Sequence, residues 1–203
     1  MLVRLTLTVA LAGVLASGCG SRAGAPRRAH DLRAVAFLAP APAGSALPAS
    51  AVAAMHLNAA NARRHGAFRD RTGIARGIWT ATTAEGQACV LDVGPDQVGA
   101  GCGPTLFGGH RLAFTEAVEG GPGPSSTTAV RIAGVAAAGV DTVAVRLSDG
   151  SLALVTPNDA GAFVYEESPA EITGGRLPVE LSAREGTAKQ VDRIDLPRTP
   201  VVP

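Results

Sequence analysis

From about Gly77 to the C-terminus, apolar and polar residues alternate and turn-forming residues recur at short intervals. A period of two places successive side chains on opposite faces of a strand, so that one face can be buried. Many short strands separated by turns are typical of a sandwich or a barrel. The sequence therefore predicts a mainly β, sandwich-like domain over residues 77–203.

About nine strands are expected in this domain. A single open sheet of so many strands would curl or split into two packed layers, so a sandwich is favoured. Two of the strands form the hairpin described next, and the others are expected at residues 78–83, 88–93, 111–115, 128–135, 162–166, 177–182 and 189–196.

The dipeptide Asp149–Gly150 marks a β-hairpin, because this pair favours a two-residue turn. A two-residue turn would place Leu147 opposite Leu152 and Val145 opposite Leu154. All four side chains would then lie on one face, so turn chemistry and hydrophobic alternation predict the same register.

The N-terminus has the pattern of an export signal over residues 1–18. Arg4 is followed by an uncharged run, Leu5–Gly18, and the run ends in small residues before Cys19. This ending resembles a bacterial lipobox, in which the cysteine becomes the lipidated first residue, although Ala16 stands where Leu is commonest. An ordinary secretory signal is the alternative. A permanent span is not expected, since Gly, Ser and Arg follow the run directly.

The three cysteines fit the same interpretation. Lipidation of Cys19 would account for the odd one, and Cys89 and Cys102 would form a disulfide in an oxidising compartment. Closing a loop of about 14 residues would contribute roughly 3 kcal/mol to stability. A redox-active pair is less favoured because the two-residue spacing is missing, and a metal site because the nearest histidine is His110.

The segment before the β domain divides into two parts. Residues 19–34 are expected to form a lipidated cysteine and a flexible basic tether. Residues 35–76 are expected to form an N-terminal extension with a possible helix over about 50–64, capped by Ser50 and ended by Gly66. Irregular coil is the alternative for this stretch.

Charge is distributed unevenly. Residues 20–76 hold nine arginines and two aspartates, whereas residues 77–203 hold eight basic and fifteen acidic residues. This asymmetry indicates either a basic arm that meets an anionic surface or two parts of one fold that attract each other. In the first case, the arginines of the tether would contact anionic lipid. They are Arg22, Arg27, Arg28 and Arg33.

No set of residues in the sequence predicts a catalytic, metal or cofactor site. The chain has four histidines and no Gly-x-Ser-x-Gly elbow. His110, after two glycines, is the best single candidate for a reactive histidine, but it has no identifiable partners and a solvent-exposed loop histidine is far more common. His56 and His65 lack the spacing of a zinc site. Nucleic-acid binding is disfavoured because the β domain is acidic and its few aromatics are dispersed.

Acidic residues near turns are a second group of candidate ligands. Asp92 and Asp96 flank a Gly-Pro turn and could hold a calcium ion, but turn chemistry explains them without a ligand. Glu166 and Glu167 are neighbours in a predicted strand and would point to opposite faces, so they are not expected to act as an acid–base pair.

Several strand and turn residues resemble those of a group of small exported actinobacterial lipoproteins of unknown function. The resemblance spans about residues 36–166 and is diffuse. Ala136–Ala138 depart from the group, which often has Pro and Asp there, and extra residues separate Asn158 from Phe163. The resemblance implies architecture and no activity. The resembling residues are Ala36–Leu38, Pro40, Leu47–Pro48, Cys89–Leu91, Cys102, Gly139–Asp141, Val143, Val145, Asp149–Gly150, Asn158 and Phe163.

These observations favour a non-catalytic module outside the cytoplasm, tethered to the cell membrane through Cys19. It would bind a protein partner or have a structural role at the cell envelope. An envelope enzyme with an unrecognised site and a carrier of a small apolar ligand are the alternatives. A cavity with converging polar groups would favour the enzyme, a deep apolar cavity the carrier, and a flat surface the module.

Overall fold

The computed structural model describes residues 46–120, 127–167, 173–174, 176–186 and 189–196. The predicted leader 1–18, the tether 19–34 with its arginines, and the lipidation site Cys19 lie outside the described residues.

The described chain contains one helix and eleven strands. Their bounds are α1 (Ala49–Met55), β1 (Leu57–Arg69), β2 (Ala75–Thr83), β3 (Ala88–Val93), β4 (Val98–Gly103), β5 (Leu112–Gly120), β6 (Thr127–Ala136), β7 (Thr142–Leu147), β8 (Leu152–Val155), β9 (Ala162–Glu167), β10 (Pro178–Glu185) and β11 (Lys189–Asp195).

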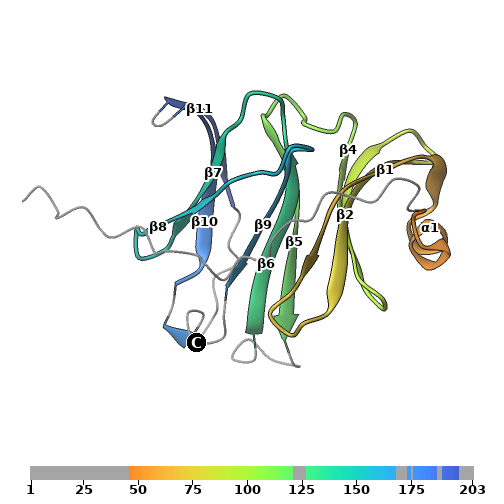
Figure 1. Ribbon diagram of the computed structural model, residues 1–203, viewed down its shortest axis with the longest axis horizontal. Coiled ribbons are helices and arrows are strands. Elements are labelled where there is room, and N and C mark those ends of the chain that lie inside the picture. The colour runs from red at the N-terminus through yellow and green to blue at the C-terminus, as the bar shows by residue number, and fades with distance from the viewer. Residues whose placement is uncertain (1–45, 121–126, 168–172, 175, 187–188, 197–203) are drawn as a thin grey trace, which may run out of the picture.

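The strands form three antiparallel sheets. Sheet A has the order β1-β2-β3-β4, sheet B the order β5-β6-β9, and sheet C the order β11-β10-β7-β8. Figure 1 shows them side by side, with sheet B between sheets A and C and with α1 at the far side of sheet A. The prediction of a mainly β, sandwich-like fold is confirmed, with a third sheet in addition to the two expected layers.

Sheet B is buried on both faces. Ile132, Phe163 and Tyr165 belong to the apolar core shared with sheet C. Ala133 and Val164 belong to the core shared with sheet A. Because successive residues of a strand point to opposite faces, β6 and β9 can bury nearly every side chain, as strands covered on both sides do.

The predicted helix over residues 50–64 is wrong beyond Met55. His56 ends α1 in the left-handed conformation with φ 49°, and β1 begins at Leu57. Gly66 lies inside β1 rather than at a helix end. Pro48 occupies the position before the helix, and no side chain caps it. Pairing with β2 overrides the weak helical preference of this alanine-rich stretch.

The expected boundary between an extension, 35–76, and a β domain, 77–203, falls inside strand β2. Strand β1 is a full member of sheet A and pairs with β2 from Leu57 to Arg69. The chain therefore joins the β fold some twenty residues before the predicted boundary.

The hairpin at Asp149–Gly150 exists, but its predicted register is wrong. The loop has three residues rather than two, because Leu147 N donates to Ser151 O at 2.9 Å. Gly150 adopts φ 78°, which closes a three-residue loop. The Asp149 carboxylate stabilises this loop by accepting a hydrogen bond from the Ser151 backbone at 2.8 Å.

The longer loop shifts β8 by one residue, so that Leu152 pairs with Arg146. A shift of one residue turns every side chain of a strand to the other face. Ala153 and Val155 are therefore buried, while Leu154 is 45% exposed.

Strand β4 was not predicted from its sequence, Val-Gly-Ala-Gly-Cys-Gly, because glycine is depleted in strands. It pairs with β3 and places Cys102 directly opposite Cys89. The two cysteines form a disulfide with a Cα–Cα distance of 4.1 Å, which confirms the predicted pair. The glycines also allow close packing, since an added Cβ at Gly101 would clash with Phe114 O of β5. Sheets A and B thus approach closely at this edge.

We expect Gly101→Ala to lower stability by about 1–3 kcal/mol, the usual cost of overpacking. The clash is with backbone, which cannot move aside without shifting β5 against β4. The matched control is Gly103→Ala in the same strand, where the new Cβ would meet Thr105 O at an ordinary 3.5 Å. Thermal unfolding of both variants checks this, and equal melting temperatures would contradict the close approach.

Candidate functional site

A buried cluster of charged side chains joins sheets A and B. Sheet A contributes Arg76 from β2 and Asp92 from β3, and Asp70 follows β1 directly. Sheet B contributes Arg131 from β6 and Glu166 from β9. Asp92, which is 0% exposed, accepts hydrogen bonds from Arg76 Nε at Oδ1 and from Arg131 Nε at Oδ2, both at 2.7 Å. One carboxylate therefore holds one arginine from each sheet.

Strand alternation explains why these charges face each other. Leu91 and Val93 belong to the core on the outer face of sheet A, against α1, so Asp92 between them points toward sheet B. Ile132 belongs to the core with sheet C, so its neighbour Arg131 points toward sheet A. Two side chains that are 39 residues apart in sequence therefore meet in the space between the two sheets.

Asp70 extends the cluster toward the surface. Its Oδ1 accepts hydrogen bonds from the Thr72 backbone, the Thr72 hydroxyl and the Ile74 backbone. Its Oδ2 lies 3.9 Å from Arg76 Nη1 and 4.0 Å from Arg131 Nη1. Burial alone would raise the pKa of Asp70, but these hydrogen bonds and the Arg131 charge outweigh it and lower the pKa below its usual value.

Glu166 lies at the other side of Arg131. Its Oε1 is 3.3 Å from Arg131 Nη1, and its Oε2 accepts a hydrogen bond from the Arg71 backbone at 2.9 Å. Burial raises the pKa of Glu166, and the bonds to Arg71 and Arg131 only partly offset this effect. The cluster thus holds one carboxyl group that favours ionisation and one that resists it.

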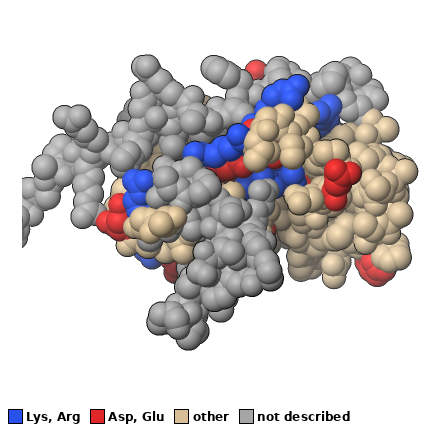
Figure 2. Space-filling view, turned by 90° about the horizontal axis from the view of Figure 1, so that it is seen from below, with Lys and Arg blue, Asp and Glu red and all other residues tan. Residues whose placement is uncertain are grey.

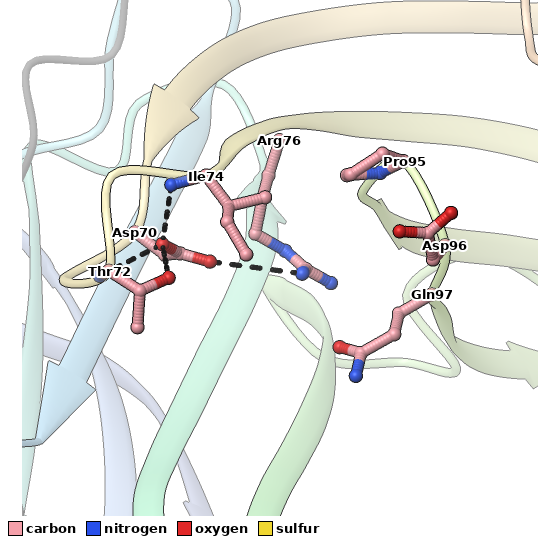
Figure 3. Close-up of a pocket in the computed structure, with 7 residues that line it drawn as sticks. All are labelled: Asp70, Thr72, Ile74, Arg76, Pro95, Asp96 and Gln97. Carbon is pink, nitrogen blue, oxygen red and sulfur yellow. Dashed lines mark hydrogen bonds and ion pairs between the residues drawn. The ribbon is translucent and has the colours of Figure 1, made fainter.

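Two adjoining cavities open beside the cluster, and both are lined by Arg76 and Gln97. The first, of about 170 Å³, lies between the loop after β1 and the turn between β3 and β4. The second, of about 510 Å³, continues past Gln97 to Glu116, Val118 and Arg131. Figure 2 shows basic and acidic side chains next to each other near the middle of this face of the molecule. Figure 3 shows the residues that line the first cavity.

The histidines are dispersed over the described chain. His110 is half exposed, and its Nδ1 lies 3.1 Å from Asp192 Oδ1, a partner 82 residues away that the sequence did not indicate. Burial would raise the pKa of Asp192, but bonds from the Arg111 backbone and from His110 lower it. His65 bonds Thr80 Oγ1 at 2.8 Å, and His56 is exposed after α1. No serine, threonine or cysteine bonds His110 among the described residues.

The interpretation of Asp92 as a turn residue is wrong, since it lies within β3 and is the centre of the cluster. A usable signal was present in the sequence: Asp92 and Arg131 each stand between apolar residues in a predicted strand. Glu166 and Glu167 are neighbours in β9, where strand alternation directs them to opposite faces, and Glu166 joins the cluster through Arg131.

The chain matches no known protein family, no curated protein and no solved structure. Among the described residues, no helix is long and apolar enough to cross a membrane. Within the same residues, His, Cys, Asp and Glu side chains nowhere form a group of three that could hold a metal ion.

We expect Asp70→Asn to lower stability at neutral pH by on the order of 1 kcal/mol. Asparagine keeps the acceptor oxygen for Thr72 and Ile74 and removes only the charge that faces the two arginines. Because the folded-state pKa of Asp70 is lowered, its stabilisation is present above the ordinary aspartate pKa and is lost as pH falls through the folded-state value.

The difference in free energy of unfolding between wild type and Asp70→Asn should therefore become smaller below about pH 4. Urea unfolding between pH 7 and pH 3 measures this difference. Asp96→Asn, an exposed position at the cavity rim, is the control and should follow the wild type. A gap that is independent of pH would show that the charge of Asp70 does not stabilise the fold.

Proposed function

We propose that this chain is an extracytoplasmic lipoprotein, anchored to the cell membrane through Cys19, whose β domain is a non-catalytic binding module at the cell envelope. The observation that carries the proposal is the cysteine arrangement. Cys19 follows a leader that ends in small residues, and Cys89 and Cys102 are already paired with each other. A protein disulfide also suits an oxidising compartment, which supports export.

The form of the β domain supports a binding role. The three sheets and the disulfide make a framework in which the loop after β1 and the β3–β4 turn are held at fixed positions. Between these two segments lies the cavity lined by Arg76, where charged and apolar side chains meet. Binding sites commonly combine such a preformed hollow with a few polar groups.

We expect labelled fatty acid to enter the wild-type protein and not Cys19→Ser, because the thiol is the acylated group. The variant should appear in the medium or accumulate as an unprocessed precursor. Cys102→Ser is the control, since it removes another cysteine and should leave labelling intact. Equal labelling of wild type and Cys19→Ser would refute lipid anchoring at this residue.

The tether leads to a second expectation, that the domain works close to its own membrane. A flexible segment of about 15 residues spans only about 20 Å r.m.s.. Near an anionic lipid surface, each tether arginine would contribute about 1 kcal/mol, and the effect decays over a Debye length of about 8 Å. The acidic β domain would face away from the same surface.

To test this, the non-lipidated full chain is mixed with anionic and neutral vesicles at low and high salt. Its binding is compared with that of a variant in which Arg22, Arg27, Arg28 and Arg33 are changed to glutamine. We expect a salt-sensitive preference of the wild type for anionic vesicles. If the variant binds equally well, the tether is only a spacer.

A further inference from the structure

The Arg76 side chain is largely buried, and one of its three guanidinium nitrogens makes a hydrogen bond within the described residues. The residue is 4% exposed, and its Nε donates to Asp92. Its Nη1 lies 3.9 Å from Asp70 Oδ2, which is an ion pair too long for a hydrogen bond. Among the described residues, neither Nη1 nor Nη2 makes a hydrogen bond. Arg76 lines the first cavity, so these two nitrogens are accessible to a ligand that enters it.

The free end of the side chain is directed into the first cavity. Figure 3 shows the guanidinium between Asp70 and Ile74 on one side and Asp96 and Gln97 on the other. Gly94 makes this position possible, because a Cβ there would lie 2.8 Å from Arg76 Nη1. Asp92 holds the side chain by accepting a hydrogen bond from Nε, so that Nη1 and Nη2 face the cavity.

We propose that this cavity binds a small monocarboxylate, with Arg76 Nη1 and Nη2 donating to the two carboxylate oxygens. The planar fork of a guanidinium matches a planar carboxylate in a bidentate arrangement. The Gln97 side chain, exposed and lining both cavities, is placed to bind a polar group of the same ligand. This inference deepens the proposed binding role and does not depend on the lipid anchor.

The charges of the site select for a single negative charge on the ligand. Asp70 and Asp96 line the same cavity, and like charges close together are unfavourable. Phosphate, which carries between one and two charges at neutral pH, would be repelled more strongly than a carboxylate. Asp92 holds the Arg76 side chain in place through Nε. The nearby carboxylates of Asp70 and Asp96 limit the negative charge that a ligand of Arg76 can carry.

The apolar residues that line the two cavities indicate that the ligand carries an apolar group next to its carboxylate. Ile74 is 43% exposed and lines the first cavity together with Pro95. Val118 is 58% exposed and lines the second cavity. These two account for most of the large apolar side chains that are exposed in the described chain, where Leu154 is the other. A short aliphatic acid or the C-terminal residue of a peptide has this combination of groups.

The test uses the full-length protein, purified in detergent, and titrates it with butyrate, butyramide and inorganic phosphate. Binding is followed by calorimetry and by the NMR signal of the Arg76 Nε–H group. We expect saturable binding of butyrate with a shift of that signal, binding weaker by about tenfold or more for phosphate, and none for butyramide, which lacks the charge. A blocked dipeptide with a free C-terminus, beside its amide, tells a peptide ligand from a free acid.

Two variants make the test specific to the site. Gly94→Ala should displace the guanidinium without removing its charge and weaken butyrate binding by about tenfold or more. Asp96→Asn removes a negative charge at the rim of the cavity that repels the ligand, and it should increase the affinity for butyrate a few-fold. Arg146→Gln, at an exposed arginine in sheet C, is the control and should bind as the wild type does.

Thermal unfolding of each variant establishes that it is folded. If Gly94→Ala does not fold, the Asp96→Asn result and the Arg76 signal still decide. Absence of saturable binding by every carboxylate, or equal binding of phosphate and butyrate, would overturn the proposal. Loss of carboxylate binding with normal lipid labelling would reject this site alone, and the reverse result would reject only the lipid anchor.

Discussion

The Asp92 carboxylate is the interaction on which the arrangement of sheets A and B depends. Each of its oxygens accepts one arginine Nε, from Arg76 in its own sheet and from Arg131 in the facing sheet. Removing the Asp92 carboxylate would leave both Nε groups without this acceptor, and breaking a buried ion pair commonly costs about 3–5 kcal/mol. Apolar contacts between two sheets are non-directional, whereas this hydrogen-bonded contact forms at only one relative position of the sheets. The cluster therefore contributes specificity to the packing of two sheets that are otherwise held by small and branched apolar side chains.

The position of the cluster makes Arg76 part of a buried ion-pair network and also part of a cavity wall. The core between sheets A and B consists of residues such as Ile78, Val90 and Val164, and the charges lie where this core meets the loop after β1 and the β3–β4 turn. At the edge of the core, Asp92 can be fully buried while Arg76 still reaches a cavity. A charged group in the middle of the core would have had no access to a ligand, and one on the surface would have been screened by water.

Most of the fold could be predicted from the sequence, and the errors have identifiable physical causes. Strand β3 was predicted with its observed bounds, because its apolar run and flanking turns are local signals. The first half of β1 has the alanine-rich composition of a helix, and its strand conformation depends on pairing with β2, which is not a local signal. The hairpin register depended on one additional loop residue around Gly150. The disulfide followed from cysteine counting, whereas the cluster did not, since its members come from five separate segments. The link from the basic segment to the acidic domain, through Arg76 and Asp92, agrees with the interpretation that the two parts attract each other.

The order of the strands along the chain has a consequence for the rate of folding. Sheet A is a meander of consecutive strands, β1 to β4, so its contacts are local and should form quickly. Sheets B and C are interleaved: the chain passes from β6 to β7 and β8 in sheet C, returns to β9 in sheet B, and leaves again for β10. Sheet B cannot be completed until the chain has passed through β7 and β8 of sheet C, and such non-local pairing is slow. Because synthesis proceeds from the N-terminus, sheet A should form early, with Asp92 and Arg76 in place. The contact between Asp92 and Arg131 can form only after β6 has been made.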